Sequence, residues 1–532
     1  MKNIALALLL ITAMTGTVAA QEIVVDSVNI AKFAGLLKGG NMGEVLYMPY
    51  FIKGGNDKKN FVIRQIESHS MREEKIVRLE LPQSYGLSGS AFNGMAYLLA
   101  FYDAGKKENV LLTVSNGNVV KKKTAKAGDK KYIPLSSHEG FILVTVDGKG
   151  RYTVENVDLE LKTKWEKSFS PPSGSTWDLI SVKRKMEGLE IIRKENGAGG
   201  KYAFSMHIMQ PEDGTDMAQS TIGNEDMNPY PTFISEKEGM IFTGGYFFKN
   251  GTYSKQPDGV FMGLLGLDGN LNDVAKVPFS QVIEALKSTL GGKLASGDAS
   301  IIFSSGTMLH ETQTFVMTGQ LVSRKQKENS CVLTLDEFVT IKIGFDGTFK
   351  DASVIKTTAE QITLEGDTKN TNTLDLGIWL NNAGLSHFKY YAHMTGNPIM
   401  SYVTIDENGV SNLCFRNVGL ANDTLDPICM PLNREPSKAT PYTFTGTATP
   451  PSVVNFNSVI VEEPLAMSYT TYGMISDGHL TLRKAPLQSL EKLEVMIMPE
   501  DPPMDEPHEE EPPIDEEPPA DEPPAEEAAP EQ

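Results

Sequence analysis

The sequence predicts an all-β protein built from a repeated unit. Residues 241–247 (Ile-Phe-Thr-Gly-Gly-Tyr-Phe) are echoed 75 residues later by residues 316–322 (Val-Met-Thr-Gly-Gln-Leu-Val), and Met394-Thr-Gly follows another 77 residues on. A second unit lies downstream of the first two copies: residues 266–273 match residues 344–351, and residues 405–410 are a looser third copy. A period of this length, made of strands and Asp-Gly turns, is typical of a β-propeller, in which four-stranded blades surround a central axis.

Strand and turn signals run from Ile23 to about Met498. Residues 339–345 alternate apolar and polar side chains, which predicts a half-buried strand. Residues 141–146 are nearly all apolar, which predicts a strand covered on both faces. Both runs end at Asp-Gly pairs, and residues 114–119 contain an Asn-Gly pair. These dipeptides favour type I′ hairpins, because such turns need positive φ at both central residues.

The repeat length gives an expected number of blades. The body, residues 21–498, has about 475 residues, which predicts roughly six blades, and shorter N-terminal units would raise the number to seven. A pair of β-sandwich domains is the alternative. One helical signal covers residues 280–290, where Val282, Ile283, Leu286 and Leu290 can share a face before Gly291-Gly292 stops the helix. Because it lies between repeat units, we expect an insertion on the rim.

The two ends of the chain differ from the body. Residues 1–20 combine Lys2, an apolar run from Ile4 to Met14 and the small residues Val18-Ala-Ala, a pattern typical of a secretory signal peptide. No run approaches the roughly 20 apolar residues that a membrane span requires, so no transmembrane segment is expected. Residues 499–532 contain 15 acidic residues, 11 prolines and no Lys or Arg, which predicts a disordered acidic tail. Such a tail can serve as a solubilising segment, a spacer, a docking segment for a basic partner or a weak calcium binder.

Charge and cysteines limit the class of protein. The formal net charge is −19, and removing the tail and Lys2 leaves −5 for the body. Nucleic acid is not an expected partner, because it requires a basic face. The three cysteines, Cys331, Cys414 and Cys429, permit one disulfide; Cys414 with Cys429 would close a short loop. The signal peptide predicts export to the periplasm or to the exterior or surface of the cell.

No complete catalytic motif is present in the sequence. It lacks the His-Glu-x-x-His zinc motif, the P-loop and the dinucleotide-binding glycine pattern. Gly86-Leu-Ser-Gly-Ser lacks the last glycine of a nucleophile elbow. The eight histidines are scattered, and we interpret His207 and His393 as packed or edge residues of strands. The sequence therefore predicts no catalytic residue, no cofactor and no metal site.

Two resemblances bear on the fold. In Ser-Pro-Pro-Ser-Gly-Ser-Thr-Trp, residues Ser170, Gly174, Thr176 and Trp177 resemble the Asp-box of sialidase-type propellers, although Pro172 replaces the aspartate. In that family the box is a structural turn between outer strands, so the resemblance implies no catalytic residue. Residues 92–102 and 256–261 are similar to blade strands of uncharacterised exported bacterial propeller-like proteins, which implies a propeller and no assigned activity.

Aromatic side chains are the candidates for ligand binding. Rings offer flat apolar faces and polar edges to a sugar, so Trp165, Trp177, Trp379, Tyr390 and Tyr391 could build a platform. Of these, Trp379, Tyr390 and Tyr391 form the expected platform. The competing interpretation is that aromatic residues in strands pack in the core.

These features favour an exported, non-catalytic binding or scaffold protein of the cell envelope. A propeller surface would bind a protein or glycan partner, because loops on a rigid frame commonly carry function. The alternative is a secreted glycan-active hydrolase on a propeller scaffold, which needs only two suitably spaced carboxylates among 68 acidic residues. A purely structural envelope component fits the same sequence, and the oligomeric state is not indicated.

Overall fold

The chain forms a ring of antiparallel β-sheets. The structure, a computed structural model, describes residues 22–25, 37–39, 45–52, 58–67, 72–126, 130–185, 188–223, 227–237, 240–310, 312–366, 368–382, 388–392, 398–405, 411–417, 427–431, 442–443, 459–461, 469–476 and 479–486. The expected signal peptide, residues 1–20, and the acidic tail, residues 499–532, lie outside these described residues.

The strands of the first half are β1 (Glu22–Val25), β2 (Leu37–Gly39), β3 (Val45–Phe51), β4 (Lys58–Glu67), β5 (Arg72–Pro82), β6 (Tyr85–Phe92), β7 (Ala96–Asp103), β8 (Glu108–Ser115), β9 (Asn118–Lys126), β10 (Lys131–Ser137), β11 (Gly140–Val146), β12 (Tyr152–Val157), β13 (Thr163–Phe169), β14 (Thr176–Arg184), β15 (Leu189–Asn196), β16 (Tyr202–Met209) and β17 (Asp216–Ile222). Those of the second half are β18 (Pro229–Lys237), β19 (Met240–Phe247), β20 (Gly259–Leu265), β21 (Leu271–Pro278), β22 (Ala299–Leu309), β23 (Thr314–Gln326), β24 (Ser330–Gly344), β25 (Phe349–Ile355), β26 (Glu360–Glu365), β27 (Phe388–Ala392), β28 (Pro398–Ile405), β29 (Ser411–Asn417), β30 (Ile428–Pro431), β31 (Tyr442–Thr443), β32 (Val459–Val461), β33 (Tyr469–Ser476) and β34 (His479–Pro486). The helices are η2 (Ala198–Gly200), α2 (Phe279–Ala285), α3 (Gly291–Ser296) and α4 (Thr373–Asn382).

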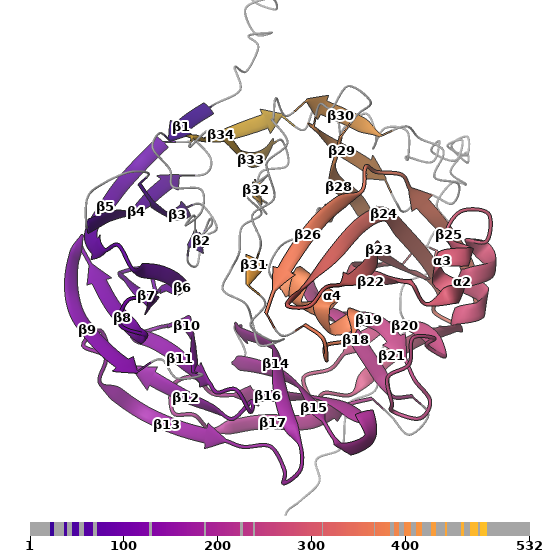
Figure 1. Ribbon diagram of the computed structural model, residues 1–532, viewed down its shortest axis with the longest axis horizontal. Helices are drawn as coiled ribbons and strands as arrows, with labels where there is room; N and C mark the ends of the chain where they lie inside the picture. Colours follow the sequence, from indigo (N-terminus) through magenta and orange to yellow (C-terminus); the bar gives the residue numbers. More distant parts are fainter. Residues whose placement is uncertain are drawn as a thin grey trace, which may run out of the picture.

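These strands confirm the predicted propeller class. The described residues contain eight sheets, seven with four strands and one with six, and Figure 1 shows them side by side around a ring. The seven four-stranded sheets agree with the upper end of the expected six to seven four-stranded blades, and the six-stranded sheet that contains β22 to β26 and β31 is one more than the repeat length predicts. The estimate used the 75-residue repeat, whereas the sheet of β10 to β13 needs only the stretch from Lys131 to Phe169.

The two ends of the described chain close the ring together. β1 pairs antiparallel with β34, with Glu22 opposite Arg483. The N-terminal strand thus completes a sheet whose other strands, β32 to β34, come from the C-terminal part of the chain. Backbone hydrogen bonds between distant parts of the sequence therefore hold the ring shut.

The sequence repeats occupy equivalent places in two neighbouring sheets. Thr243 and Thr318, the threonines of the two Thr-Gly copies, are both fully buried in the second strand of their sheets, β19 and β23. The Asp-Gly units follow the third strands, and Gly269 and Gly347 both have φ of +79°. The looser third copies around Gly396 and in residues 406–410 lie outside the described residues.

The hairpin turns differ in type from one another. Asn116 and Gly117 have φ of +50° and +79°, which confirms the expected type I′ turn. At Asp147 the expectation is wrong. Positive φ occurs at Gly150, and Asp147 N–H donates to the Arg151 carbonyl, so the loop has three residues and ends in a left-handed glycine. The Asp147 carboxylate favours this longer loop by accepting the N–H groups of Lys149 and Arg151.

Apolar side chains pack between neighbouring sheets. Phe61, Tyr85 and Phe101, for example, join the β2–β5 sheet to the β6–β9 sheet. Strand β11 is almost wholly buried, as residues 141–146 predicted. Each sheet lies between two others in the ring, so the alternative of two β-sandwich domains is wrong.

Residues 339–345 depart from the half-buried strand that their alternation predicts. They belong to β24, and residues 339–344 are buried on both faces, including Thr340 and Lys342. The reason is tertiary: β24 is a long strand that pairs with β25 through Phe338–Ile343 and with β26 through Ser330–Leu335. Neighbouring sheets then cover both of its faces.

The helices complete the ring. The signal over residues 280–290 is confirmed as a rim insertion, because Figure 1 shows α2 and α3 on the outside of the ring. Gly291 begins α3 instead of ending the helical segment. Among the helices of the described residues, none has the length and apolar character that a bilayer crossing requires.

Candidate functional site: a charged groove between two sheets

Helix α4 lies inside the ring (Figure 1). Its C-terminal amides bind inward-facing strands of three sheets: Asn381 Nδ2 donates to the carbonyls of Thr232 and Phe303, and Asn382 Nδ2 donates to the carbonyl of Ile180. Every residue from Leu374 to Leu380 is buried. This part of the centre, where a propeller often binds ligands, is therefore filled by the chain itself.

A buried ionic network fixes the other end of α4. Lys194 Nζ donates to both carboxylate oxygens of Asp375, at 2.9 and 2.8 Å, and to the Tyr230 hydroxyl at 2.8 Å. Asn372 caps the helix by accepting the Asp375 N–H at 2.8 Å and donates to Tyr230 at 3.0 Å. The side chains of Lys194 and Asp375 are only 4% and 9% exposed. Because the network is closed and internal, its role is to anchor α4.

The expected aromatic platform is not formed by Trp379. This residue lies on α4 and is 1% exposed, so its ring packs in the core and offers no face to a ligand. Tyr390 and Tyr391 lie on β27, where they pair with Met400 and Ile399, and their side chains are outside what the structure describes. The sequence does not distinguish a buried aromatic residue such as Trp379 from one on a ligand-binding surface, because aromatic rings occur in both places.

The other two tryptophans also have structural roles. Trp165 Nε1 donates to the Pro211 carbonyl, and Trp177 packs beneath the Arg193 guanidinium at 4.0 Å from the ring centroid. The Asp-box-like segment ending at Trp177 connects β13 to β14, which belong to different sheets. It therefore does not occupy the outer-strand position that the box has in sialidase-type propellers.

A groove of about 160 Å³ opens between the β6–β9 sheet and the β10–β13 sheet. This volume is close to the ~150 Å³ that accommodates a benzene-sized molecule. Leu111 and Leu143, which belong to the apolar core between these sheets, lie at its base. We call it the inter-sheet groove and define it by its charged lining residues, Lys123, Lys130, Glu155 and Glu166.

The lining of the inter-sheet groove carries charges of both signs. Lys123 lines it from β9, Lys130 from the position just before β10, and Glu155 and Glu166 from β12 and β13. None of the four belongs to an ion pair within the described residues, although Glu155 accepts a hydrogen bond from Thr163 at 3.1 Å. Charged side chains that have no ion-pair partner within the protein can replace bound water with the charged groups of a partner molecule.

The protonation of two residues at or beside the groove, Tyr132 and Lys131, also bears on its polarity. Burial, together with nearby Glu155, raises the pKa of the Tyr132 hydroxyl, so this lining group stays protonated and can donate a hydrogen bond. Burial lowers the pKa of Lys131 to about 8, although Asp178 opposes the shift. At neutral pH, two kinds of hydrogen-bond donor, a tyrosine hydroxyl and a lysine ammonium group, therefore lie at or beside the groove.

The strand that forms one rim is wholly exposed. All nine residues of β9 are exposed, and four of them are lysines: Lys121, Lys122, Lys123 and Lys126. β9 is the last strand of its sheet, so no strand among the described residues pairs with its outer edge. Motifs and repeats in the sequence do not reveal this feature; its signal is the lysine run itself in an otherwise acidic chain.

A pair of adjacent carboxyl groups lies elsewhere, at the irregularity where β24 changes its pairing partner. Burial and a hydrogen bond shared with Asp336 raise the pKa of Glu337. Burial opposes the shift at Asp336, but its pKa is lowered by hydrogen bonds from Lys293, at 2.9 Å, and from Glu337. Separated pKa values are what an acid–base pair requires. This pair does not line the inter-sheet groove.

His207 is a packed residue, as expected. It is fully buried on β16, its Nε2 lies 2.9 Å from Asp216 Oδ1, and the Phe169 ring packs edge-on against it. His393 lies outside the described residues. Within the part of the chain that the structure describes, no three His, Cys, Asp or Glu side chains gather as a metal site.

One disulfide joins two paired strands. Cys414 on β29 is bonded to Cys429 on β30, and Cys331 is a buried free thiol. The structure thus selects the pairing that the sequence left open.

Comparisons with known proteins give distant likenesses only. No protein family matches the chain, and no curated protein matches it in sequence. The WD40 domain of SCAP from fission yeast is 10% identical with a TM-score of 0.38, covering 87% of this chain and 98% of that one. The quinohemoprotein alcohol dehydrogenase from Comamonas testosteroni is 9% identical with a TM-score of 0.41, covering 87% of this chain and 76% of that one.

A prolyl endopeptidase is 10% identical with a TM-score of 0.32, covering 70% of this chain and 46% of that one. This chain therefore spans less than half the length of that structure. Likenesses at this level assign no activity and no ligand. The description of the fold rests on the strand order of the chain itself.

Proposed function

We propose that this protein is an exported, non-catalytic binding or scaffold protein of the cell envelope, which uses its propeller surface to bind a protein or glycan partner. The observation that carries the proposal is the inter-sheet groove, which is lined by Lys123 and Lys130 and by Glu155 and Glu166. A partner that carries both anionic and cationic groups can pair with lining residues of both signs at once. Protein surfaces and charged glycans have this chemistry.

Two further observations support the location and the surface. A disulfide such as Cys414–Cys429 persists mainly in oxidising compartments, which agrees with the signal peptide that the sequence predicts. Helix α4 fills part of the centre of the ring, which favours a binding surface on the perimeter. Exported localisation can be checked directly by fractionating cells and locating the mature protein.

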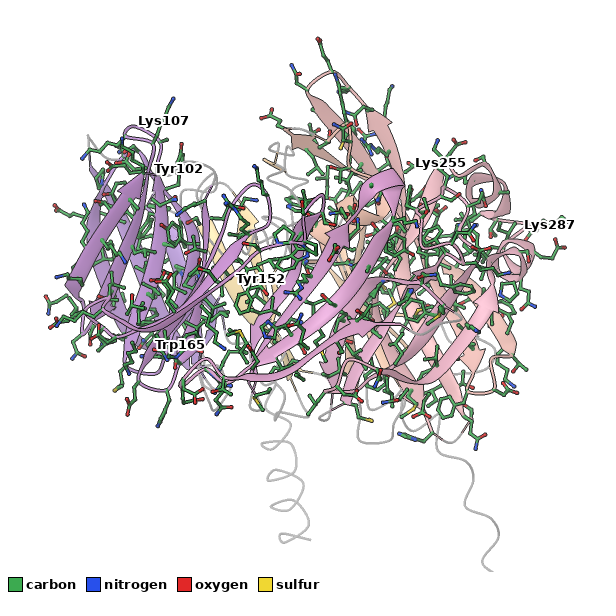
Figure 2. All side chains as sticks on the ribbon, turned by 90° about the horizontal axis from the view of Figure 1, so that it is seen from below. Tyr102, Lys107, Tyr152, Trp165, Lys255 and Lys287 are labelled. Atoms are coloured by element: carbon green, nitrogen blue, oxygen red, sulfur yellow. A yellow bond between two sulfur atoms is a disulfide. The ribbon has the colours of Figure 1, made fainter. Side chains whose placement is uncertain are left out.

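The test of the groove is affinity capture of the full-length protein after crosslinking in intact cells. We expect a partner that is captured by the native protein and lost, by about tenfold, from a K123Q/K130Q variant. The matched control is K255Q/K287Q, which removes two exposed lysines on the other side of the ring (Figure 2). Equal capture by the two variants would refute a role for the groove.

A glycan-active hydrolase is the second candidate, with Asp336 and Glu337 as its carboxyl pair, because their pKa values are shifted in opposite directions. Their shared hydrogen bond holds them closer together than the roughly 5 Å that glycoside hydrolysis uses, so the two groups must separate to act on a glycan. If this function holds, the native protein releases sugars from envelope glycans and the E337Q variant does so at least ~100-fold more slowly. E328Q, which changes an exposed acid in the turn before β24, is the control. Absence of cleavage by the native protein across a glycan panel would remove this candidate.

A further inference from the structure

Basic and acidic residues are segregated along this chain. Residues 104–131 contain eight lysines against two acidic residues, a net charge of +6 in a body whose total is −5. The rest of the body therefore carries −11. The tail, residues 499–532, adds fifteen negative charges and no positive one. Residues 104–131 thus offer the acidic tail a strongly complementary charge, while the remainder of the body has a net charge of the same sign as the tail.

The structure buries the β8 part of this segment and exposes most of its lysines, four of them on β9. Seven of its lysines are exposed: Lys106, Lys107, Lys121, Lys122, Lys123, Lys126 and Lys130. We call them the basic patch. Figure 2 shows Lys107 at one side of the molecule, with Lys255 and Lys287 at the opposite side.

The basic patch is accessible and largely uncompensated. Within the described residues, none of its lysines takes part in an ion pair. Lys122 Nζ donates to the Tyr85 hydroxyl at 3.0 Å, which leaves its charge unneutralised. Lys121 lies near Glu160, whose carboxylate pairs with Lys162 instead. The lysines of β9 lie on both faces of an uncovered edge strand, so an extended acidic chain can approach them along the whole strand.

We infer that the acidic tail of this chain docks on its own basic patch. The contact would be electrostatic and multivalent. An exposed pair of opposite charges contributes only about 0–1 kcal/mol, so several pairs are needed to hold the tail. Prolines keep such a segment extended, which lowers the entropy lost on docking. Covalent attachment adds an effective concentration in the millimolar range.

The position of the tail along the chain permits this contact. Glu500, the first acidic residue of the tail, lies fourteen positions after Pro486, the end of β34. Fully extended, such a linker reaches up to roughly 45–50 Å. The sheet that contains β34 is separated from the β6–β9 sheet by one other sheet, β2 to β5 (Figure 1).

The inference goes beyond the proposed function and does not depend on it, because both participants belong to this chain. It has a consequence for the groove: Lys123 and Lys130 belong both to the basic patch and to the groove lining. A docked tail therefore competes with an anionic partner for the same ammonium groups. An external partner must displace the tail before it binds.

Zero-length carbodiimide coupling of the full-length protein tests the contact, because it joins a carboxylate to a lysine only where the two touch. We expect tail carboxylates to couple to basic-patch lysines at least about fivefold more often than to Lys255, Lys287 and Lys327, all of which are exposed. The preference should disappear in roughly 0.5 M NaCl, where screening is strong. In an equimolar mixture of ¹⁴N- and ¹⁵N-labelled protein, coupled peptides should carry a single isotope.

Variants distinguish docking from general attraction. K121Q/K123Q/K126Q should lose most of the tail coupling, and K255Q/K287Q/K327Q should keep it, with unchanged melting curves for both. Even coupling to all exposed lysines would overturn the inference and leave the β9 lysines as edge protection alone. Mixed-isotope products would overturn it in favour of contact between copies. None of these outcomes depends on whether an external partner is captured. The coupling experiment can therefore refute tail docking without refuting the proposed function, and the capture experiment can refute the proposed function without refuting tail docking.

Discussion

Lys194 and Asp375 show how single residues hold the inside of the ring. Removing one charge of a buried pair leaves the other uncompensated, which usually costs about 3–5 kcal/mol. We therefore expect D375N to lower the free energy of unfolding in urea by that amount, because Lys194 stays buried at 4% exposure. E284Q breaks the pair of Glu284 with Lys287, both 72% exposed, and should change stability by less than about 0.5 kcal/mol. A loss below about 1 kcal/mol in D375N would contradict the anchoring role of the network.

His207 should make stability depend on pH. Burial lowers its pKa below the ordinary value, although Asp216 opposes the shift. The unfolded chain therefore binds this proton at higher pH than the folded chain does. The stabilising contribution is fully present above about pH 6.5 and is lost as the pH falls through the folded pKa. Lys167 and Arg193 also disfavour the protonated form, so they act in the same direction as burial.

Two measurements check this expectation. The free energy of unfolding should fall between about pH 7.5 and 5.5, and the fall should be smaller in H207Q. The ring of His207 should titrate below about 6.5 by NMR. Titration at or above that value would show that Asp216, and not burial, dominates the environment.

At the scale of strands, the glycine of the repeated Thr-Gly pair in β23 explains how adjacent strands of one sheet approach closely. A Cβ on Gly319 would lie 2.6 Å from the carbonyl oxygen of Ile302 on the adjacent strand. G319A should therefore push β22 and β23 apart and cost about 1–3 kcal/mol. Gly292 has nothing within 4 Å of its added Cβ and lies in α3, so G292A should be neutral or stabilising by up to about 1 kcal/mol. Thermal unfolding of both variants compares them, and equal melting temperatures would contradict the close-approach explanation.

Local patterns predicted some elements correctly because local physics decides them. The Asn116-Gly117 turn, the buried strand β11 and the rim helix α2 depend on residues close together in sequence. Helix α4 was not predicted, because an element that is apolar on nearly all sides has no periodic signal, and only the surrounding sheets stabilise it. The same burial removed Trp379 from the candidate site.

At the scale of the molecule, the repeat predicted the propeller but could not count its blades. The plain copies lie in two sheets, whereas the other sheets follow shorter and less regular stretches. The inter-sheet groove was equally hidden, since Lys123 and Glu166 line it from two different sheets and no sequence pattern relates them. Charge distribution, in contrast, can be read from the sequence, and the ring determines where that charge is presented.

The central claim is that the inter-sheet groove is the surface at which this protein binds its partner. The most direct test places a photoreactive amino acid at Thr124, which lines the groove, and another at Gln281, an exposed position on α2, and irradiates intact cells. The account predicts a discrete crosslinked partner from Thr124 that is absent from Gln281 and disappears when K123Q and K130Q are added. No product from Thr124, or the same products from both positions, would contradict it.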